Sequence, residues 1–150
     1  ITTQVGSGAK RPAAPAPGAN LGSLDPVGYP YCHICTPFLS SASVITSQTQ
    51  RHAHMQENLD LYDAIENGTL PAVSFVKPST FNDGHPSSSR LDLFESFTRR
   101  IIYQVISHEE LWECTEIMVT NDEGGGYYDS GYVNRLDYFG AGTRLPFLVG

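Results

Sequence analysis

The sequence predicts an α/β fold in which helices cover a mostly parallel sheet. Two segments show the three- and four-residue apolar spacing of helices, and three short apolar runs follow or separate them. The order helix, strand, helix, strand, strand favours parallel pairing through crossover helices. The predicted strands are continuous apolar runs, which is typical of strands buried on both faces of a sheet.

The chain is expected to have a flexible start and one folded domain. Residues 6–22 are rich in Ala, Pro and Gly, so residues 1–28 are predicted to be a flexible segment. Residues 29–150 are predicted to form the folded part. Within it, residues 29–38 are expected to form an ordered loop, and residues 40–50 are polar, with no helix or strand predicted.

The first predicted helix and strand follow one another closely. Apolar residues three or four apart predict a helix from Met55 to about Glu66. The pair Asn67-Gly68 supplies the left-handed conformation that ends many helices. Residues 72–76 then predict a buried strand, which Lys77-Pro78 closes.

The second half repeats this order. Residues 79–89 are predicted to be a loop, and the apolar spacing of residues 93–106 predicts the second helix. A strand is expected over residues 115–120, before the polar turn 121–126. The final strand is expected over residues 145–149.

In α/β folds, ligands bind beyond the carboxyl ends of the strands. This rule points to the loop after Val76, which contains His85, and to the loop after Thr120, which contains Asp122 and Glu123. We expect the two loops to face one another.

Composition narrows the class of partner. The 150 residues suggest one domain, and 9 Lys plus Arg against 16 Asp plus Glu give a net charge of −7. Nucleic acid and anionic lipid need a cationic surface, so we expect neither as the main partner. No apolar run is long enough for a transmembrane helix. Because the chain starts at Ile1 and stops within an apolar run, we expect it to be part of a longer protein.

The three cysteines leave two interpretations open. Cys32 and Cys35 have C-x-x-C spacing, and Cys114 stands alone. A structural zinc site needs four ligands, usually from two such pairs. We favour a structural role for the pair, either as a local disulfide or as buried thiols. A redox pair is the weaker hypothesis.

Two adjacent acids are the sharpest chemical feature. Asp122 and Glu123 follow a predicted strand and precede three glycines. Carboxylate oxygens are hard ligands suited to divalent cations, and glycines let the backbone approach a ligand closely. The competing interpretation is an ordinary solvated turn, since acids beside glycine are common in turns.

Two of the histidines, His85 and His33, are candidate site residues. A loop histidine such as His85, in Asp83-Gly84-His85-Pro86, can bind a phosphate oxygen, ligate a metal or transfer a proton. A single such residue is more often a surface histidine, and the interest of His85 comes from its expected neighbourhood with Asp122. His33 lies among aromatic residues and is a second candidate for a pocket. We interpret the His52-Ala53-His54 run as structural.

Taken together, these runs resemble a known family. Residues 116–129 are similar to the late metal-site motif of bacterial phosphoesterases, the acid phosphatases and phospholipases C of the alkaline phosphatase superfamily. Residues 67–78 and 83–86 resemble the strand and histidine loop before that motif. Residues 138–146 resemble the run into the next strand, and residues 31–38 resemble an upstream segment of one branch.

The resemblance implies a fold, a reaction and site residues. It implies part of an alkaline-phosphatase-like sandwich that hydrolyses phosphoric esters through a phosphoenzyme, with a divalent metal ion of unknown identity. Asp122 and Glu123 would be metal ligands, and His85 would contact the phosphoryl oxygens or assist the leaving group. His33 would lie near the substrate, and Asp129 at the rim.

The same resemblance implies that part of the machinery lies elsewhere. The family's early Glu-Asn ligand pair is not recognisable, and its nucleophile segment lies upstream of Tyr29, so residues 29–150 resemble the later half of the catalytic domain. The implied partners are a phosphate ester and the remainder of that domain. The implied location is secreted or periplasmic. Ser130 stands where many members have histidine.

Two other hypotheses compete with the hydrolase. A non-catalytic interaction protein that retains part of the phosphoesterase fold would explain the missing nucleophile. A redox protein using Cys32 and Cys35 is the third hypothesis.

Overall fold

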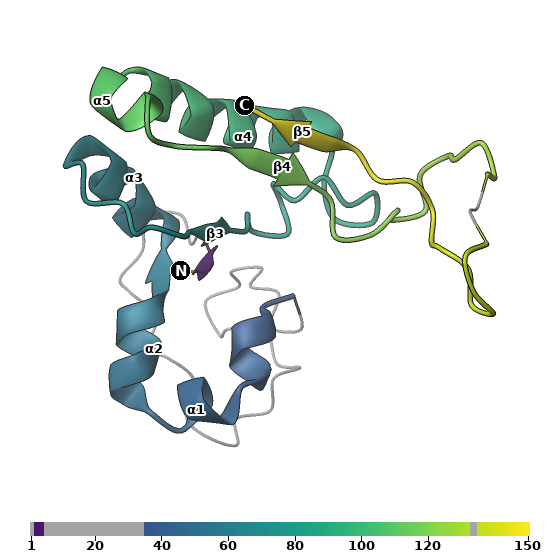
Figure 1. Cartoon of the computed structure of the whole chain (residues 1–150), viewed down its shortest axis with the longest axis horizontal. Coiled ribbons are helices and arrows are strands. Elements are labelled where there is room, and N and C mark those ends of the chain that lie inside the picture. The colour runs from purple at the N-terminus through teal and green to yellow at the C-terminus, as the bar shows by residue number, and fades with distance from the viewer. Residues whose placement is uncertain (1, 5–34, 133–134) are drawn as a thin grey trace.

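The computed structural model describes residues 2–4, 35–132 and 135–150 (Figure 1). The described elements, in chain order, are β1 (Thr2–Gln4), η1 (Pro37–Ser40), α1 (Ala42–Ile45), α2 (Gln48–His54), β2 (Met55–Glu57), α3 (Asn58–Glu66), β3 (Phe75–Val76), α4 (Leu91–Ile106), α5 (Glu109–Trp112), β4 (Met118–Thr120) and β5 (Phe147–Val149). Of the predicted flexible segment 1–28, only residues 2–4 are described, and they form β1.

Short helices occupy the polar segment for which no element was predicted. Residues 42–45 form α1, and α2 begins at Gln48 after the helix cap Ser47, whose hydroxyl accepts a hydrogen bond from Gln50 N at 3.2 Å. A serine cap offsets the poor helix propensity of such a segment. These helices lie below α3, α4 and the strands in Figure 1.

The helix α3 starts later than its apolar spacing predicts. Met55 and its two successors form β2, and a capping box of Glu57 and Asp60 sets the helix start, with Glu57 N donating to Asp60 Oδ2 at 2.9 Å. The predicted end is confirmed. Asn67 caps α3, and Gly68 has a φ of 63°, a conformation that glycine adopts without strain.

The core lies where α3 packs against α4. Leu61, Ile65 and Val105 form its buried cluster. Partly buried apolar residues pack around it: Leu70, Val76, Ile101, Leu111 and Ile117.

Polar contacts extend this helix pair. Gln104 Nε2 donates to the carbonyl oxygen of Tyr62 at 2.9 Å, and the Arg100 guanidinium lies 4.0 Å from the centre of the Tyr62 ring. Burial raises the pKa of the Tyr62 hydroxyl, which the nearby Arg100 charge partly opposes. The long helix over 93–106 is thus confirmed as α4, with two further residues at its start.

The mixed α/β class is confirmed, but one mostly parallel sheet is not. A small parallel sheet has the order β2-β1-β3, whereas β4 and β5 form a separate antiparallel pair in which Val119 faces Leu148. Parallel pairing needs a crossover element between the strands. Residues 121–146, as far as they are described, contain no helix, so the chain returns beside β4 in the opposite direction.

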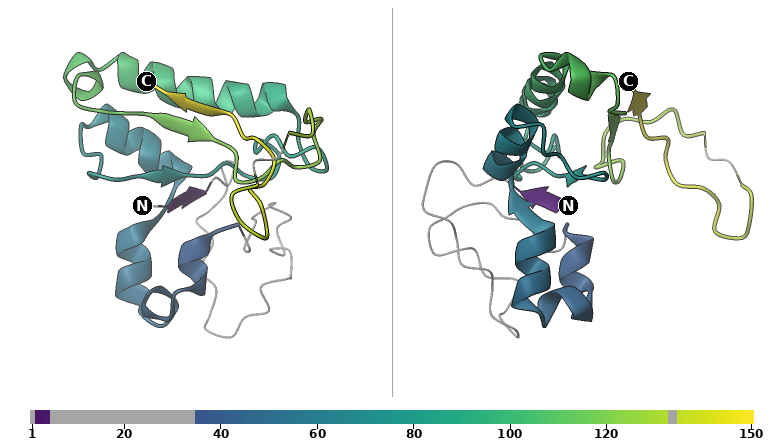
Figure 2. Two further views of the ribbon diagram at one scale, coloured as in Figure 1. Left: turned by 45° about the vertical axis from the view of Figure 1, so that its right-hand side comes forward. Right: turned by 60° about the vertical axis from the view of Figure 1, so that its left-hand side comes forward.

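The predicted burial of the strands is also wrong. Phe75 is 61% exposed and Leu148 is 64% exposed. The helix α4 lies along one side of the β4–β5 pair, as both views of Figure 2 show, and the described residues leave much of the pair's apolar surface open.

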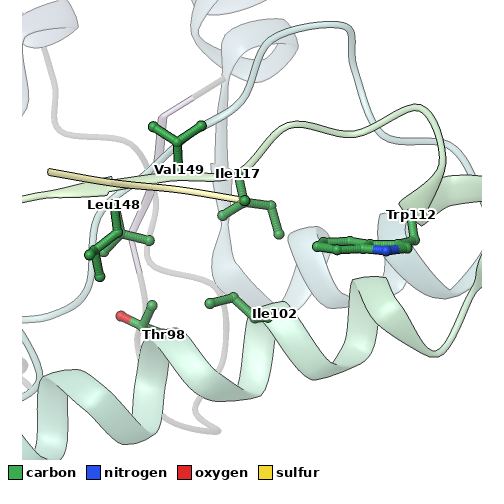
Figure 3. Close-up of a pocket in the computed structure, with 8 residues that line it drawn as sticks. Thr98, Ile102, Trp112, Ile117, Leu148 and Val149 are labelled. Atoms are coloured by element: carbon green, nitrogen blue, oxygen red, sulfur yellow. The ribbon is translucent and has the colours of Figure 1, made fainter.

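An apolar groove runs between α4 and the β4–β5 pair. Thr98 and Ile102 of α4 face Ile117 and Leu148 across it, and Trp112 lies at one end (Figure 3). Within the described part of the chain, no helix is both long and apolar enough to cross a bilayer.

Candidate active site

The histidine loop is fixed by its own backbone contacts. Asp83 Oδ1 accepts a hydrogen bond from His85 N at 2.9 Å, which closes a tight turn around Gly84. Gly84 has a φ of 77°, and a β-carbon there would lie 3.1 Å from Phe94 Cβ on α4. The loop therefore sits directly against α4, and this close approach requires glycine.

The His85 ring is bound on both nitrogens. Nδ1 lies 3.2 Å from Ser87 N and 2.8 Å from Ser87 Oγ. Nε2 lies 3.2 Å from Glu123 Oε1. The side chain is 40% exposed, so a ligand from solvent has access to a ring whose orientation is already set.

The acidic loop follows β4 and approaches the histidine loop closely. Gly125 has a φ of 61°, and a β-carbon there would lie 3.1 Å from Pro86 Cδ and 3.6 Å from His85 Cδ2. Tyr127 OH donates to the carbonyl oxygen of Gly84 at 2.9 Å. The expectation that the two loops face one another is confirmed.

Asp122 has a different neighbour from Glu123. Its Oδ2 lies 3.5 Å from Nζ of Lys77, the residue directly after β3. The Asp122 side chain is 73% exposed, whereas that of Lys77 is 25% exposed. The site thus contains two carboxylates, one lysine and one imidazole within two adjoining loops and a strand end.

The described donors do not by themselves complete a metal site. Asp122 and Glu123 offer oxygen atoms of the right chemistry for a hard divalent cation. However, Lys77 and His85 occupy their near contacts. Among the residues that the structure describes, no three His, Cys, Asp or Glu side chains are grouped closely enough to hold a metal ion.

Asp129 lies in a different set of contacts from the two acids. Its Oδ2 is 3.7 Å from Arg144 Nε, and its Oδ1 accepts from Gly131 N at 2.8 Å. Arg144 also donates to Ser130 Oγ. The described contacts of Asp129 therefore support the loop beyond the acids.

The other histidines and the cysteines make no described contact with the two loops of the site. His33 and Cys32 lie outside the described residues. Cys35 is disulfide-bonded, and Cys114 is a free, exposed cysteine. His52 and His54 are exposed on α2, and His108 Nε2 contacts Glu66 Oε2 at 3.3 Å.

Three residues of the site were not among the predicted ones. Lys77 directly follows β3, so the rule that ligands bind beyond the carboxyl ends of strands could have predicted it. Ser87 lies in the loop predicted over residues 79–89, and its contact with His85 depends on how that loop folds. Tyr127 joins the two loops through its hydroxyl, for which the sequence has no signal.

Comparison with known proteins decides the family. The model of the Phosphoesterase family matches residues 31–149, which includes both loops of the site. The chain belongs to the phosphoesterase family. An acid phosphatase from Aspergillus niger is 28% identical to this phosphoesterase over 83 residues, 55% of the chain and 19% of that protein. A probable acid phosphatase from Kluyveromyces lactis is 23% identical over 116 residues, 77% of the chain and 27% of that protein.

The two coverages also show what share of each relative's length the chain matches. The chain spans about a fifth to a quarter of the length of the curated relatives it matches. Both relatives are fungal, so the resemblance is not limited to bacterial members of the family.

Proposed function

We propose that this chain is part of the catalytic domain of a phosphoric ester hydrolase. The observation that carries the proposal is the contact between the two loops, in which His85 Nε2 lies 3.2 Å from Glu123 Oε1, within a region that matches the family. Both relatives are named as acid phosphatases, which favours a phosphomonoester over a phospholipid as substrate.

His85 would act on the phosphoryl group directly. Its ring is half-exposed and held on both sides, so it can donate a hydrogen bond to a phosphoryl oxygen or protonate a leaving oxygen. Lys77 would add a positive charge beside Asp122, and a fixed cation stabilises the charge of a transferring phosphoryl group. His33 stays a predicted substrate contact outside the described residues.

The proposed site includes a divalent metal ion, because the charges of its two acids call for a cation. Asp122 and Glu123 would repel a phosphate ester that binds beside them. A bound cation is the ordinary way to combine carboxylates and phosphate in one site. The two acids would supply oxygen ligands, and further ligands would come from residues outside the described ones.

The remainder of the catalytic domain is the proposed partner. It would contribute the serine or threonine nucleophile of a phosphoenzyme route, since no residue of the described site is assigned that role. The length of the relatives supports this division. The disulfide at Cys35 supports a secreted or periplasmic location, because disulfides persist mainly in oxidising compartments.

Phosphate release by the full-length protein tests the function. We expect hydrolysis of a simple phosphomonoester, and we expect His85→Asn to lower turnover by about 100-fold or more, the usual contribution of a positioned acid or base. His54→Asn, at an exposed position of α2, is the matched control and should retain wild-type turnover. Wild-type turnover in the His85 variant would contradict the proposal.

A further inference from the structure

One bond to the His85 ring fixes where its proton lies. The backbone N–H of Ser87 points at Nδ1 with the nitrogen atoms 3.2 Å apart, and a backbone N–H can only donate. Nδ1 must therefore accept, so it carries no proton. The Ser87 hydroxyl, 2.8 Å from the same nitrogen, must then also be a donor.

The proton of the neutral ring consequently sits on the opposite nitrogen. A neutral imidazole has one N–H, and when Nδ1 accepts, that group is on Nε2. Nε2 is the nitrogen 3.2 Å from Glu123 Oε1, so its N–H is directed at the acidic loop. Ser87, two positions after His85, thus sets the tautomer from the Nδ1 side of the ring, opposite the side that faces the site.

We propose that Ser87 is a positioning residue that holds His85 as an Nε2–H donor toward the site. This inference rests on the proposed function, in which that N–H meets a phosphoryl oxygen. Ser87 acts through the imidazole and does not touch the substrate, because its hydroxyl is bound to the nitrogen on the other edge of the ring. Ser88, its neighbour, contacts Asp83 Oδ1 at 3.4 Å and has no described bond to the ring, so it provides a matched control.

Nitrogen NMR of the 150-residue chain, labelled with ¹⁵N-histidine, tests the tautomer without any activity measurement. The His85 signals are assigned from their loss in His85→Gln, in a mildly alkaline buffer of about pH 8.5. We expect wild-type Nδ1 to resonate as an unprotonated nitrogen and Nε2 as a protonated one. Ser87→Ala keeps the backbone N–H bond to Nδ1 but loses the hydroxyl bond, so both signals should shift part of the way toward those of a freely exchanging imidazole. Ser87→Thr should restore them.

The control and the contrary outcomes are equally direct. Ser88→Ala should leave the His85 signals unchanged. A proton on Nδ1 in the wild type, or identical His85 signals in wild type and Ser87→Ala, would overturn the inference.

Kinetics of the full-length protein separate this inference from the proposed function. Ser87→Ala should lower turnover by about 2- to 10-fold, the effect of one lost hydrogen bond, with Ser87→Thr restoring it and Ser88→Ala without effect. If the full-length protein hydrolyses phosphomonoesters but Ser87→Ala changes neither turnover nor the ring signals, the inference fails and the function stands. If the ring signals respond as expected in a protein without phosphatase activity, the function fails and the assigned tautomer stands.

Discussion

At the scale of single residues, Gly125 is where the two loops of the site touch. It has a positive φ, and a β-carbon there would lie 3.1 Å from Pro86 Cδ. We expect Gly125→Ala to cost about 1 to 3 kcal/mol of unfolding free energy through backbone strain, and also to separate His85 from Glu123. The measurement is urea unfolding of the chain together with phosphatase turnover of the full-length protein.

Gly126 is the matched control for this change. It also has a positive φ, of 85°, but a β-carbon there would meet nothing within 4 Å. Gly126→Ala should therefore lower the free energy of unfolding through backbone strain but retain wild-type phosphatase turnover. Equal losses of activity in the two variants would show that contact between the loops is not what the site depends on.

Asp122 tests the metal part of the proposal. Exchanging its carboxylate for an amide removes a charged oxygen ligand and leaves the shape nearly unchanged, so Asp122→Asn should weaken metal binding by about 10- to 100-fold or more. The metal content of the purified full-length protein measures this independently of turnover. Asp63→Asn, on the exposed side of α3, is the control, and unchanged metal content in Asp122→Asn would remove this acid from the metal site.

At the scale of elements, the α3–α4 contact carries the described core. Ile65 is 1% exposed, whereas Leu59 of the same helix is 49% exposed. We expect Ile65→Ala to lower the free energy of unfolding by about 2 to 5 kcal/mol, because the cavity it leaves is enclosed by Leu61 and Val105. Leu59→Ala should cost far less, and a similar cost for both in thermal or urea unfolding would contradict this account of the core.

The same scale shows why helices were predicted better than strands. The helix α4 has apolar residues every three or four positions, and this pattern follows from packing on one side only. The run at residues 145–149 has no such periodicity, and its continuous apolar character predicts a buried, parallel strand. Pairing direction depends on the path of residues 121–146, which local sequence does not encode, and β5 is antiparallel and exposed.

At the scale of the whole molecule, the contact between the two loops was predictable although the sheet was not. The rule that ligands bind beyond the carboxyl ends of strands needs only two strand ends that lie close together. The strands β3 and β4, which end at Val76 and Thr120, satisfy it although they belong to separate sheets. The contacts of Ser87 and Tyr127 were beyond prediction, because they depend on how the loops fold. The groove beside Trp112 and the exposed β5 are likewise properties of the assembled fold.

The most direct measurement of the central claim is a crystal structure of the full-length protein with orthovanadate, an anion that resembles a transferring phosphoryl group. The account predicts the vanadium centre between the two loops, with one oxygen within hydrogen-bond distance of His85 Nε2 and Asp122 and Glu123 facing the same centre. An anion bound elsewhere, with His85 and both acids turned to bulk solvent, would contradict it.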